Sequence, residues 1–351
     1  MTGLSAAPER LPIASEVAWS SRDVADPKQW TTQLTAIQRK DLVDAARLVT
    51  RRGETTPEVL GAAFDLPSLR ADVASWLEEL RAGRGFVLAR GFPIEDLTAR
   101  QTELAYVGLG LQMGTPVSQN AAGNLLGHVR DEGIARHDPS VRLYQTRQRQ
   151  DFHTDGADIV GLLCLRPASA GGESRIASSA TVHNRILCER PDLIEVLYAP
   201  MFWDRNDEQP EGEDPYFPLP VISDVAGSPR IFFIGWYIRD AQRHPALPRL
   251  TDQQIEAIEL IERIANDPAV HLEMEFKPGD IQWLANDRIL HSREAYRDPP
   301  DQEQRRHLLR LWLVAHSYAS VHGVLRGGIP TKDGVEPPDE RNGVEPPDER
   351  S

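Results

Sequence analysis

The segment around position 153 contains the residues best suited to chemistry. His153 and Asp155 are separated by one residue, and a second histidine, His291, lies far along the chain. In an extended strand, side chains two residues apart point the same way, with their Cα atoms about 7 Å apart. An imidazole and a carboxylate can then converge on one ion, and a histidine from a distant strand can complete one face of an octahedron. The remaining positions stay open, which is what an oxygen-activating iron requires.

These three residue types leave other functions open. A His-x-Asp triplet also occurs by chance, as a surface or hydrogen-bonding pair, and two histidines with one carboxylate suit Zn²⁺ as well. One alternative function is therefore a zinc-dependent hydrolase. Another is a metal-binding barrel that senses a small carboxylate without catalysis. The flanking sequence favours a built site, because an apolar run at 159–165 follows the triplet and a strand-like stretch at 305–314 follows His291.

The last strand-like stretch has two clear faces. One face consists of apolar residues apart from His307, and we expect it to pack beneath the barrel. The other contains Arg306 and Arg310, about 13 Å apart at Cα, together with Leu308, Trp312 and Val314. A buried guanidinium needs an anionic partner, and a carboxylate can accept two parallel hydrogen bonds from it. A dicarboxylate cosubstrate would supply such a partner, although the chain also has 53 acidic residues that could pair with these arginines.

Residues 85–317 resemble the Fe(II)/2-oxoglutarate-dependent dioxygenases of the taurine dioxygenase (TauD/TfdA-like) family, on its clavaminate synthase-like branch. The motifs that carry the resemblance are His153-Thr154-Asp155, Gly171-Gly172-Glu173-Ser174, the segment from Asn286 to His291, and the Arg-Arg-x-Leu-Leu-Arg strand. The resemblance implies an α+β, mainly β fold. Its core would be a double-stranded β-helix (jelly-roll, cupin-like) buttressed by helices. The resemblance also implies Fe(II) as cofactor, 2-oxoglutarate as cosubstrate, and O₂.

The resemblance assigns roles to individual residues as well. His153, Asp155 and His291 match the metal ligands, while Arg306 and Ser174 match the residues that hold the distal carboxylate of 2-oxoglutarate. The expected reaction releases succinate and CO₂ and oxidises a substrate C–H bond, most simply by hydroxylation. Desaturation, epoxidation and ring formation would use the same residues. Related halogenases replace the carboxylate ligand by a small residue, so Asp155 disfavours halogenation.

The substrate residues are less well defined. Arg310 matches a position that contacts an acidic group of the primary substrate in several relatives, which favours a small amino-acid-like or other carboxylate-bearing molecule. Gln119 and Asn120 could contact the substrate or stabilise a hairpin. Asp158 could meet a cationic substrate group or make a structural hydrogen bond. Asn286 could orient the metal-binding segment or satisfy a turn.

Composition excludes several classes of partner. The net charge of −14 leaves no basic surface for nucleic acid or an anionic membrane. Two cysteines, Cys164 and Cys188, give no disulfide framework and indicate a reducing compartment. No apolar run approaches the length of a membrane span, so we expect a cytoplasmic protein that acts on a small molecule. The sequence does not indicate the oligomeric state.

The chain divides into three parts. We expect a loosely ordered lead-in at 1–27, a single dioxygenase domain at 28–320, and a disordered tail at 321–351 that contains a direct repeat of GVEPPDER. The segment 204–216 is acidic and without periodicity, as in a mobile lid or a plain surface loop. Arg293 and Arg305 are expected to face solvent. Periodicity and stop signals predict helices at 29–52, 69–82, 95–109, 191–197 and 251–265, and strands at 85–91, 141–146, 159–165, 174–178, 230–234, 271–276, 279–284 and 307–315.

Overall fold

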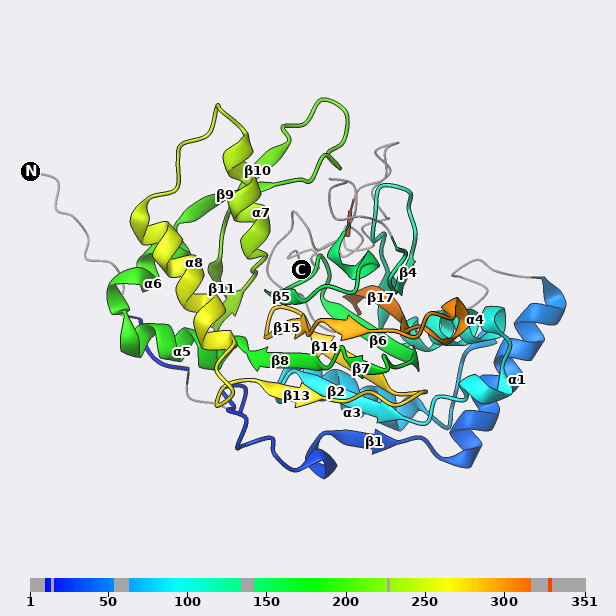
Figure 1. Ribbon diagram of the computed structural model, residues 1–351. Coiled ribbons are helices and arrows are strands. Elements are labelled where there is room, and N and C mark those ends of the chain that lie inside the picture. Colours follow the sequence, from blue (N-terminus) through cyan, green and yellow to red (C-terminus); the bar gives the residue numbers. More distant parts are fainter. Residues whose placement is uncertain are drawn as a thin grey trace, which may run out of the picture.

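Two β-sheets lie at the centre of the molecule (Figure 1). The computed structural model describes residues 10–13, 16–53, 63–133, 142–225, 228–316 and 328–329 of the 351. The larger sheet contains, in spatial order, β1 (Thr31–Gln33), β2 (Phe86–Arg90), β14 (Ile281–Ala285), β6 (Ile159–Arg166), β17 (His307–Ala315) and β3 (Gly114–Pro116), and β4 (Leu126–Val129) also pairs with β17. The smaller sheet contains β13 (Leu272–Met274), β8 (Ser174–Ser178), β15 (Ile289–Arg293) and β5 (Gln150–His153).

Apolar side chains from the two sheets form one core cluster between them. Leu308 and Trp312 of β17 belong to this cluster, and so do Ile176 of β8 and Met274 of β13. The alternate residues of β17 pack on the opposite face of the larger sheet. The two faces predicted for this strand are therefore confirmed, and the cupin-like double-sheet core is confirmed with them.

Three helices cover the outer face of the larger sheet: α1 (Ala36–Arg52), α3 (Arg70–Arg81) and α4 (Ala99–Gly110). The helix predicted at 29–52 begins too early, because a 3₁₀ turn η1 (Pro27–Gln29) and strand β1 precede it. Helix α1 begins after Thr35, whose hydroxyl accepts from the Gln38 N–H while the Gln38 side chain accepts from the Thr35 N–H. This capping box ends the extended segment and starts the helix.

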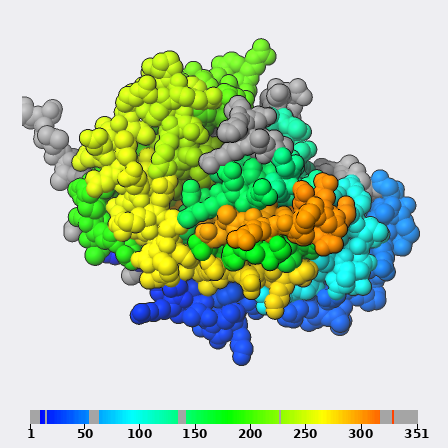
Figure 2. All heavy atoms as spheres, viewed as in Figure 1, coloured from blue at the N-terminus to red at the C-terminus, as the bar shows by residue number. Residues whose placement is uncertain are grey.

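A second lobe stands beside the sheets and has its own apolar cluster. Figure 2 shows its green to yellow-green parts at the upper left of the molecule. Its elements are α5 (Ser179–Glu189), α6 (Pro191–Tyr198), β9 (Pro200–Asp204), β10 (Tyr216–Pro220), β11 (Ile222–Val225), β12 (Ser228–Ile231), α7 (Gly235–Asp240) and α8 (Asp252–Ala265). The remaining short elements are β7 (Ala170–Gly171), β16 (Tyr296–Arg297), η2 (Ile94–Asp96), η3 (Leu143–Gln145), η4 (Ala241–Arg243) and η5 (Gln302–Gln304).

Three sequence-based expectations need correction. The strand predicted at 141–146 is instead the 3₁₀ turn η3 over its described part. The strand predicted at 230–234 is present as β12, but it begins at Ser228 and ends at Ile231. The lead-in is not loose from residue 16 onward, because Trp19 and Val24 are buried and the Trp19 ring lies 5.3 Å from that of Phe86. Trp19 and Val24 pack against apolar side chains of the sheet core, including Phe86 of β2, and the burial of this apolar surface orders the segment.

Two further expectations concern the C-terminal tail and membrane-spanning segments. The repeated tail lies outside the described residues. In the part of the chain that the structure does describe, no helix is long and apolar enough to cross a membrane.

Candidate active site

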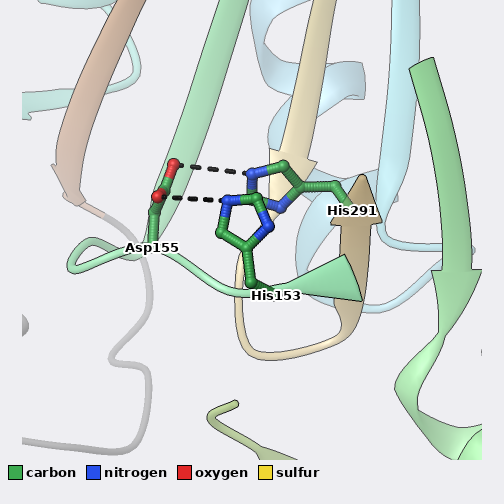
Figure 3. A group of neighbouring side chains, drawn as sticks. All are labelled: His153, Asp155 and His291. Atoms are coloured by element: carbon green, nitrogen blue, oxygen red, sulfur yellow. Dashed lines mark ion pairs between the residues drawn. The ribbon is translucent and has the colours of Figure 1, made fainter. Parts of the chain in front are cut away.

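Two neighbouring strands bring the histidines together. His153 is the last residue of β5 and is paired directly opposite His291 of β15 in the antiparallel register. Asp155 lies in the loop after β5 and points back toward both rings (Figure 3). Asp155 Oδ1 is 3.7 Å from His153 Nε2, and Asp155 Oδ2 is 3.5 Å from His291 Nε2. The expected triad is present, but a loop rather than a continuous strand places its carboxylate.

The pKa values of His153 and Asp155 suit the binding of a divalent cation. Burial and the neighbouring His291 lower the pKa of His153 to about 3, so its imidazole is neutral. Burial would raise the pKa of Asp155, but Arg310 and the two histidines hold it well below its ordinary value, so the carboxylate is charged. The possible ligand atoms all lie within 4.8 Å of one another. Two imidazoles and one carboxylate on one side of a cation fit a non-haem iron(II) with open positions.

Buried hydrogen bonds fix the loop that contains Asp155. The Asn286 side chain accepts from the Asp155 N–H at 2.7 Å and donates to the carbonyl oxygens of Asp155 and Ala157. Thr154 Oγ1 accepts from the Phe233 N–H at 2.9 Å, and its own N–H donates to the Phe233 carbonyl. Trp312 Nε1 donates to Asp155 Oδ2 at 2.9 Å. Of the two roles considered for Asn286, these contacts favour orienting the metal-binding segment over satisfying a turn.

A cavity of about 340 Å³ opens beside the metal ligands. Its wall includes Tyr144, His153, Asp155, Asn206, Trp236, Tyr237, Asp240, Arg310 and Trp312. Arg310 is buried and lies between the Tyr144 and Trp312 rings, with its guanidinium carbon 4.7 and 4.5 Å from their centres. Its Nη1 is 3.6 Å from Asp155 Oδ1. The cavity therefore combines aromatic walls with a cationic group, Arg310, next to the metal site.

A second and smaller cavity of about 40 Å³ contacts the other side of the same site. Its wall includes Gln150, His153, Ser174, His291, Ser292, Arg293, Arg306 and Arg310. Arg306 is 4% exposed, and its Nη1 has no hydrogen-bond partner among the described residues. Gly172 leaves room for this side chain, since a Cβ there would lie 3.2 Å from Arg306 Nε. Ser174 and Arg306 thus face one small space beside His291.

Three residues predicted to contact substrate line neither cavity. Gln119 is buried behind Arg310, and its Oε1 accepts from Arg310 Nε at 2.8 Å. The Asn120 side chain accepts from the N–H groups of Ala122 and Asn124, so it stabilises a turn. Asp158 accepts from the Ala315 N–H at 2.9 Å and connects its loop to β17. For each of the three residues, these contacts favour the structural alternative over contact with the substrate.

The loop at 205–215 contributes to the larger cavity. Asn206 lines that cavity, and Glu208 forms an ion pair with Arg142 on the same wall. The ion pair Arg243–Asp204, at 2.6 Å, holds the start of the loop. This segment is therefore part of the site rather than a plain surface loop, and motion as a lid stays a prediction.

Sequence reasoning missed several residues of the site. Trp312, Tyr144 and Tyr237 line the larger cavity, and Arg293 lines the smaller one instead of facing solvent. For two of these residues, the alternation of side chains along a strand could have predicted a position in the site. Trp312 follows Arg310 by two residues, and Arg293 follows His291 by two. Tyr144 and Tyr237 lie on a 3₁₀ turn and a short helix, where no such alternation operates.

Comparison with known proteins gives consistent matches. The family model described as "Taurine catabolism dioxygenase TauD, TfdA family" matches residues 51–312. FR-33289 synthase from Streptomyces rubellomurinus is 32% identical over 310 residues, which cover 87% of this chain and 91% of that protein. A taurine hydroxylase-like protein from Stachybotrys chartarum is 30% identical over 300 residues, covering 82% of this chain and 72% of that protein.

Solved structures agree on the fold. Asparagine oxygenase, in complex with Fe(II), 2S,3S-3-hydroxyasparagine and succinate, superposes with a TM-score of 0.65. The match covers 81% of this chain and 93% of that one, at 17% sequence identity. At this identity the likeness concerns the arrangement of strands and helices.

Proposed function

The chain belongs to the TauD/TfdA family of dioxygenases, and from that premise we propose that His153, Asp155 and His291 hold its iron. It is an iron(II)- and 2-oxoglutarate-dependent dioxygenase. The observation that supports the ligand assignment most strongly is the buried triad, with its two histidines in direct cross-strand register. Bound iron, with 2-oxoglutarate and O₂, supplies the oxidising power, and the cosubstrate leaves as succinate and CO₂.

For the cosubstrate, we propose that Arg306 and Ser174 bind its distal carboxylate in the smaller cavity. Ser174 Oγ now lies 3.1 Å from Gln282 Oε1, so its hydrogen points to that amide. Amide orientations are assigned from hydrogen bonding, and a turned amide would donate from Nε2 to Ser174 Oγ. The hydroxyl hydrogen would then be free for a carboxylate. The unpartnered Nη1 of Arg306 can donate to the same group.

For the primary substrate, we propose a small molecule with an anionic group bound by Arg310. The larger cavity also contains Asp240, whose pKa is raised by burial and by nearby Asp204. Anionic and cationic side chains in one cavity suit an amino-acid-like substrate. The complexed asparagine oxygenase carries such a product, and one of the sequence relatives is described as taurine hydroxylase-like.

The protein's contribution to the reaction is orientation and exclusion of water. The Trp236 ring lies 5.1 Å from that of His153, and Trp312 and Tyr144 enclose Arg310. Aromatic walls keep bulk water from the reacting C–H bond and strengthen the charged contacts of the substrate. The Trp312 N–H and Asn286 hold the Asp155 carboxylate in one direction.

The ligand assignment is tested by iron binding in His153→Ala, Asp155→Ala and His291→Ala. Each variant should lose iron retained after anaerobic loading and desalting, and should lose substrate-dependent succinate formation. His128→Ala is the matched control, because this half-buried histidine contacts His307 outside the site. Retention of stoichiometric iron by any triad variant would remove that residue from the ligand set. A zinc hydrolase or a non-catalytic sensor would form no succinate with iron present.

The substrate assignment is tested by coupling. Arg310→Ala should keep slow 2-oxoglutarate decarboxylation but lose its stimulation by substrate, with little product formed per succinate. Arg310→Lys should restore coupling only in part, because an ammonium cannot make the planar two-bond contact. Lost 2-oxoglutarate affinity with intact coupling would assign Arg310 to the cosubstrate instead.

A further inference from the structure

Arg293 is a buried cation with most of its hydrogen-bonding capacity unused. It is 6% exposed and lies at the end of β15, two residues after His291. Its Nη2 donates to the carbonyl oxygens of Leu143, at 3.3 Å, and Gln148. Its Nε and Nη1 have no partner among the described residues. Buried guanidinium donors without partners are costly, so their presence points to a ligand.

Arg306 places a second unsatisfied guanidinium in the same space. The guanidinium carbons of Arg293 and Arg306 each lie 5.0 Å from the centre of the Tyr296 ring. Both arginines line the smaller cavity together with Ser174 and Ser292, and neither lines the larger one. The Ser292 hydroxyl also lacks a partner among the described residues. These unused donors therefore surround one small space.

No carboxylate of the described chain forms an ion pair with either arginine. Asp298 accepts from the Arg306 backbone N–H at 2.9 Å, and its other oxygen has no hydrogen-bond partner within the described part of the chain. Arginine side chains stay protonated at neutral pH, so Arg293 and Arg306 are both cationic. The buried guanidinium groups of Arg293 and Arg306 repel each other, and an anion bound between them would offset this repulsion. Among the described residues that line this cavity there is no carboxylate to serve as that anion, whereas a dicarboxylate ligand can.

We propose that Arg293 is a second arginine of the cosubstrate pocket and that it binds the distal carboxylate of 2-oxoglutarate together with Arg306. This inference rests on the proposed function, which places the cosubstrate in the smaller cavity. Two guanidiniums on one carboxylate make binding depend strongly on that carboxylate. A 2-oxo acid without it would leave both cations unpaired. Arg293 is thus a residue that selects the cosubstrate.

The test compares two ligands that differ only in the distal carboxylate. Dissociation constants of 2-oxoglutarate and 2-oxobutyrate are measured by anaerobic calorimetry on iron(II)-loaded protein, so no turnover is needed. Arg293→Gln should weaken 2-oxoglutarate binding about ten-fold or more, as expected for loss of one charge-assisted contact. It should leave 2-oxobutyrate binding within about two-fold. Arg305→Gln, a half-exposed neighbour outside both cavities, is the matched control.

A purely structural role of Arg293 predicts a different result. Arg293 also holds the backbone of Leu143 and Gln148, so loss of that support would weaken both ligands equally and would overturn the proposal. An unchanged affinity for 2-oxoglutarate would overturn it as well. If the glutamine variant does not fold, Arg293→Lys keeps the charge and should still lose affinity for 2-oxoglutarate alone.

Arg306→Gln separates the proposed role of Arg293 from the proposed position of the cosubstrate pocket. Strong loss of 2-oxoglutarate in this variant, with none in Arg293→Gln, rejects only the role of Arg293. An unchanged affinity in both variants would reject the cosubstrate pocket itself.

Discussion

The Gln119 amide uses its oxygen and nitrogen to hold Arg310 and the adjacent loop. Oε1 accepts from Arg310 Nε, and Nε2 donates to the carbonyl oxygens of Arg310 and Leu125. The arrangement fixes the direction of a guanidinium that would otherwise have several rotamers. A residue that does not touch the cavity thus determines where its cation lies.

We therefore expect Gln119→Leu to raise the substrate KM about ten-fold or more, because a hydrogen bond to a buried charged group contributes about 1.5–3 kcal/mol. The KM for 2-oxoglutarate should change little, since Gln119 lies outside the smaller cavity. Steady-state kinetics with each compound varied in turn measure both constants. Asn120→Ala is the control and should behave as the unaltered enzyme, because Asn120 only stabilises a turn. Equal changes in the two variants would contradict this division of roles.

Asn286 has a comparable effect on the metal. Its side chain makes three hydrogen bonds to the backbone around Asp155. Asn286→Ala should weaken iron(II) binding by about 10–100-fold, the usual effect of removing an outer-shell partner. Anaerobic titration of the metal measures this directly. Asn184→Ala, which removes contacts to Ile13 instead, should bind iron normally. Normal iron affinity in Asn286→Ala would show that the loop holds its shape without this side chain.

Among the elements, helix α1 depends on its capping box at Thr35. Thr35→Ala should lower the free energy of unfolding by about 1 kcal/mol, because it leaves an N-terminal N–H without its partner. Catalysis should be unaffected, since α1 packs on the outer face of the larger sheet. Urea denaturation and succinate assays measure the two effects. Thr50→Ala, near the C-terminal end of the same helix, is the control and should change stability less.

The elements also show which features a sequence can predict. Successive side chains of the nine-residue strand β17 point to opposite faces of the sheet. The two faces of this strand, and the burial of Arg310 on one of them, therefore follow from the two-residue period of a strand. The position of Asp155 does not follow, because it lies in a loop whose shape depends on Asn286 and Phe233, far away in the sequence. Arg293 was expected to be exposed because isolated arginines usually are. Its burial depends on two carbonyl groups from another segment.

For the molecule as a whole, ligand binding should raise stability. The folded protein holds Arg293, Arg306 and Arg310 buried near one site, and an anion that binds there relieves their repulsion. At a ligand concentration 100 times its Kd, the stabilisation should be about 2.7 kcal/mol. Calorimetry should therefore show a higher Tm with iron(II) and 2-oxoglutarate than with either alone, and the lowest Tm after chelation. A Tm that does not respond to 2-oxoglutarate would argue against a preformed anion site.

The position of β5 has a consequence for metal exchange. This four-residue strand lies at the edge of its sheet, and its register with β15 is irregular after the His153–His291 pair. Edge strands of this kind open locally at a free-energy cost well below that of global unfolding. Release of the ion can then follow transient detachment of β5, which withdraws Phe152 from the apolar cluster of the second lobe but leaves the core between the two sheets intact. Because the ion joins two strands that are distant in the chain, its capture should also slow amide hydrogen exchange at Phe152 and His153 far more than in the helices.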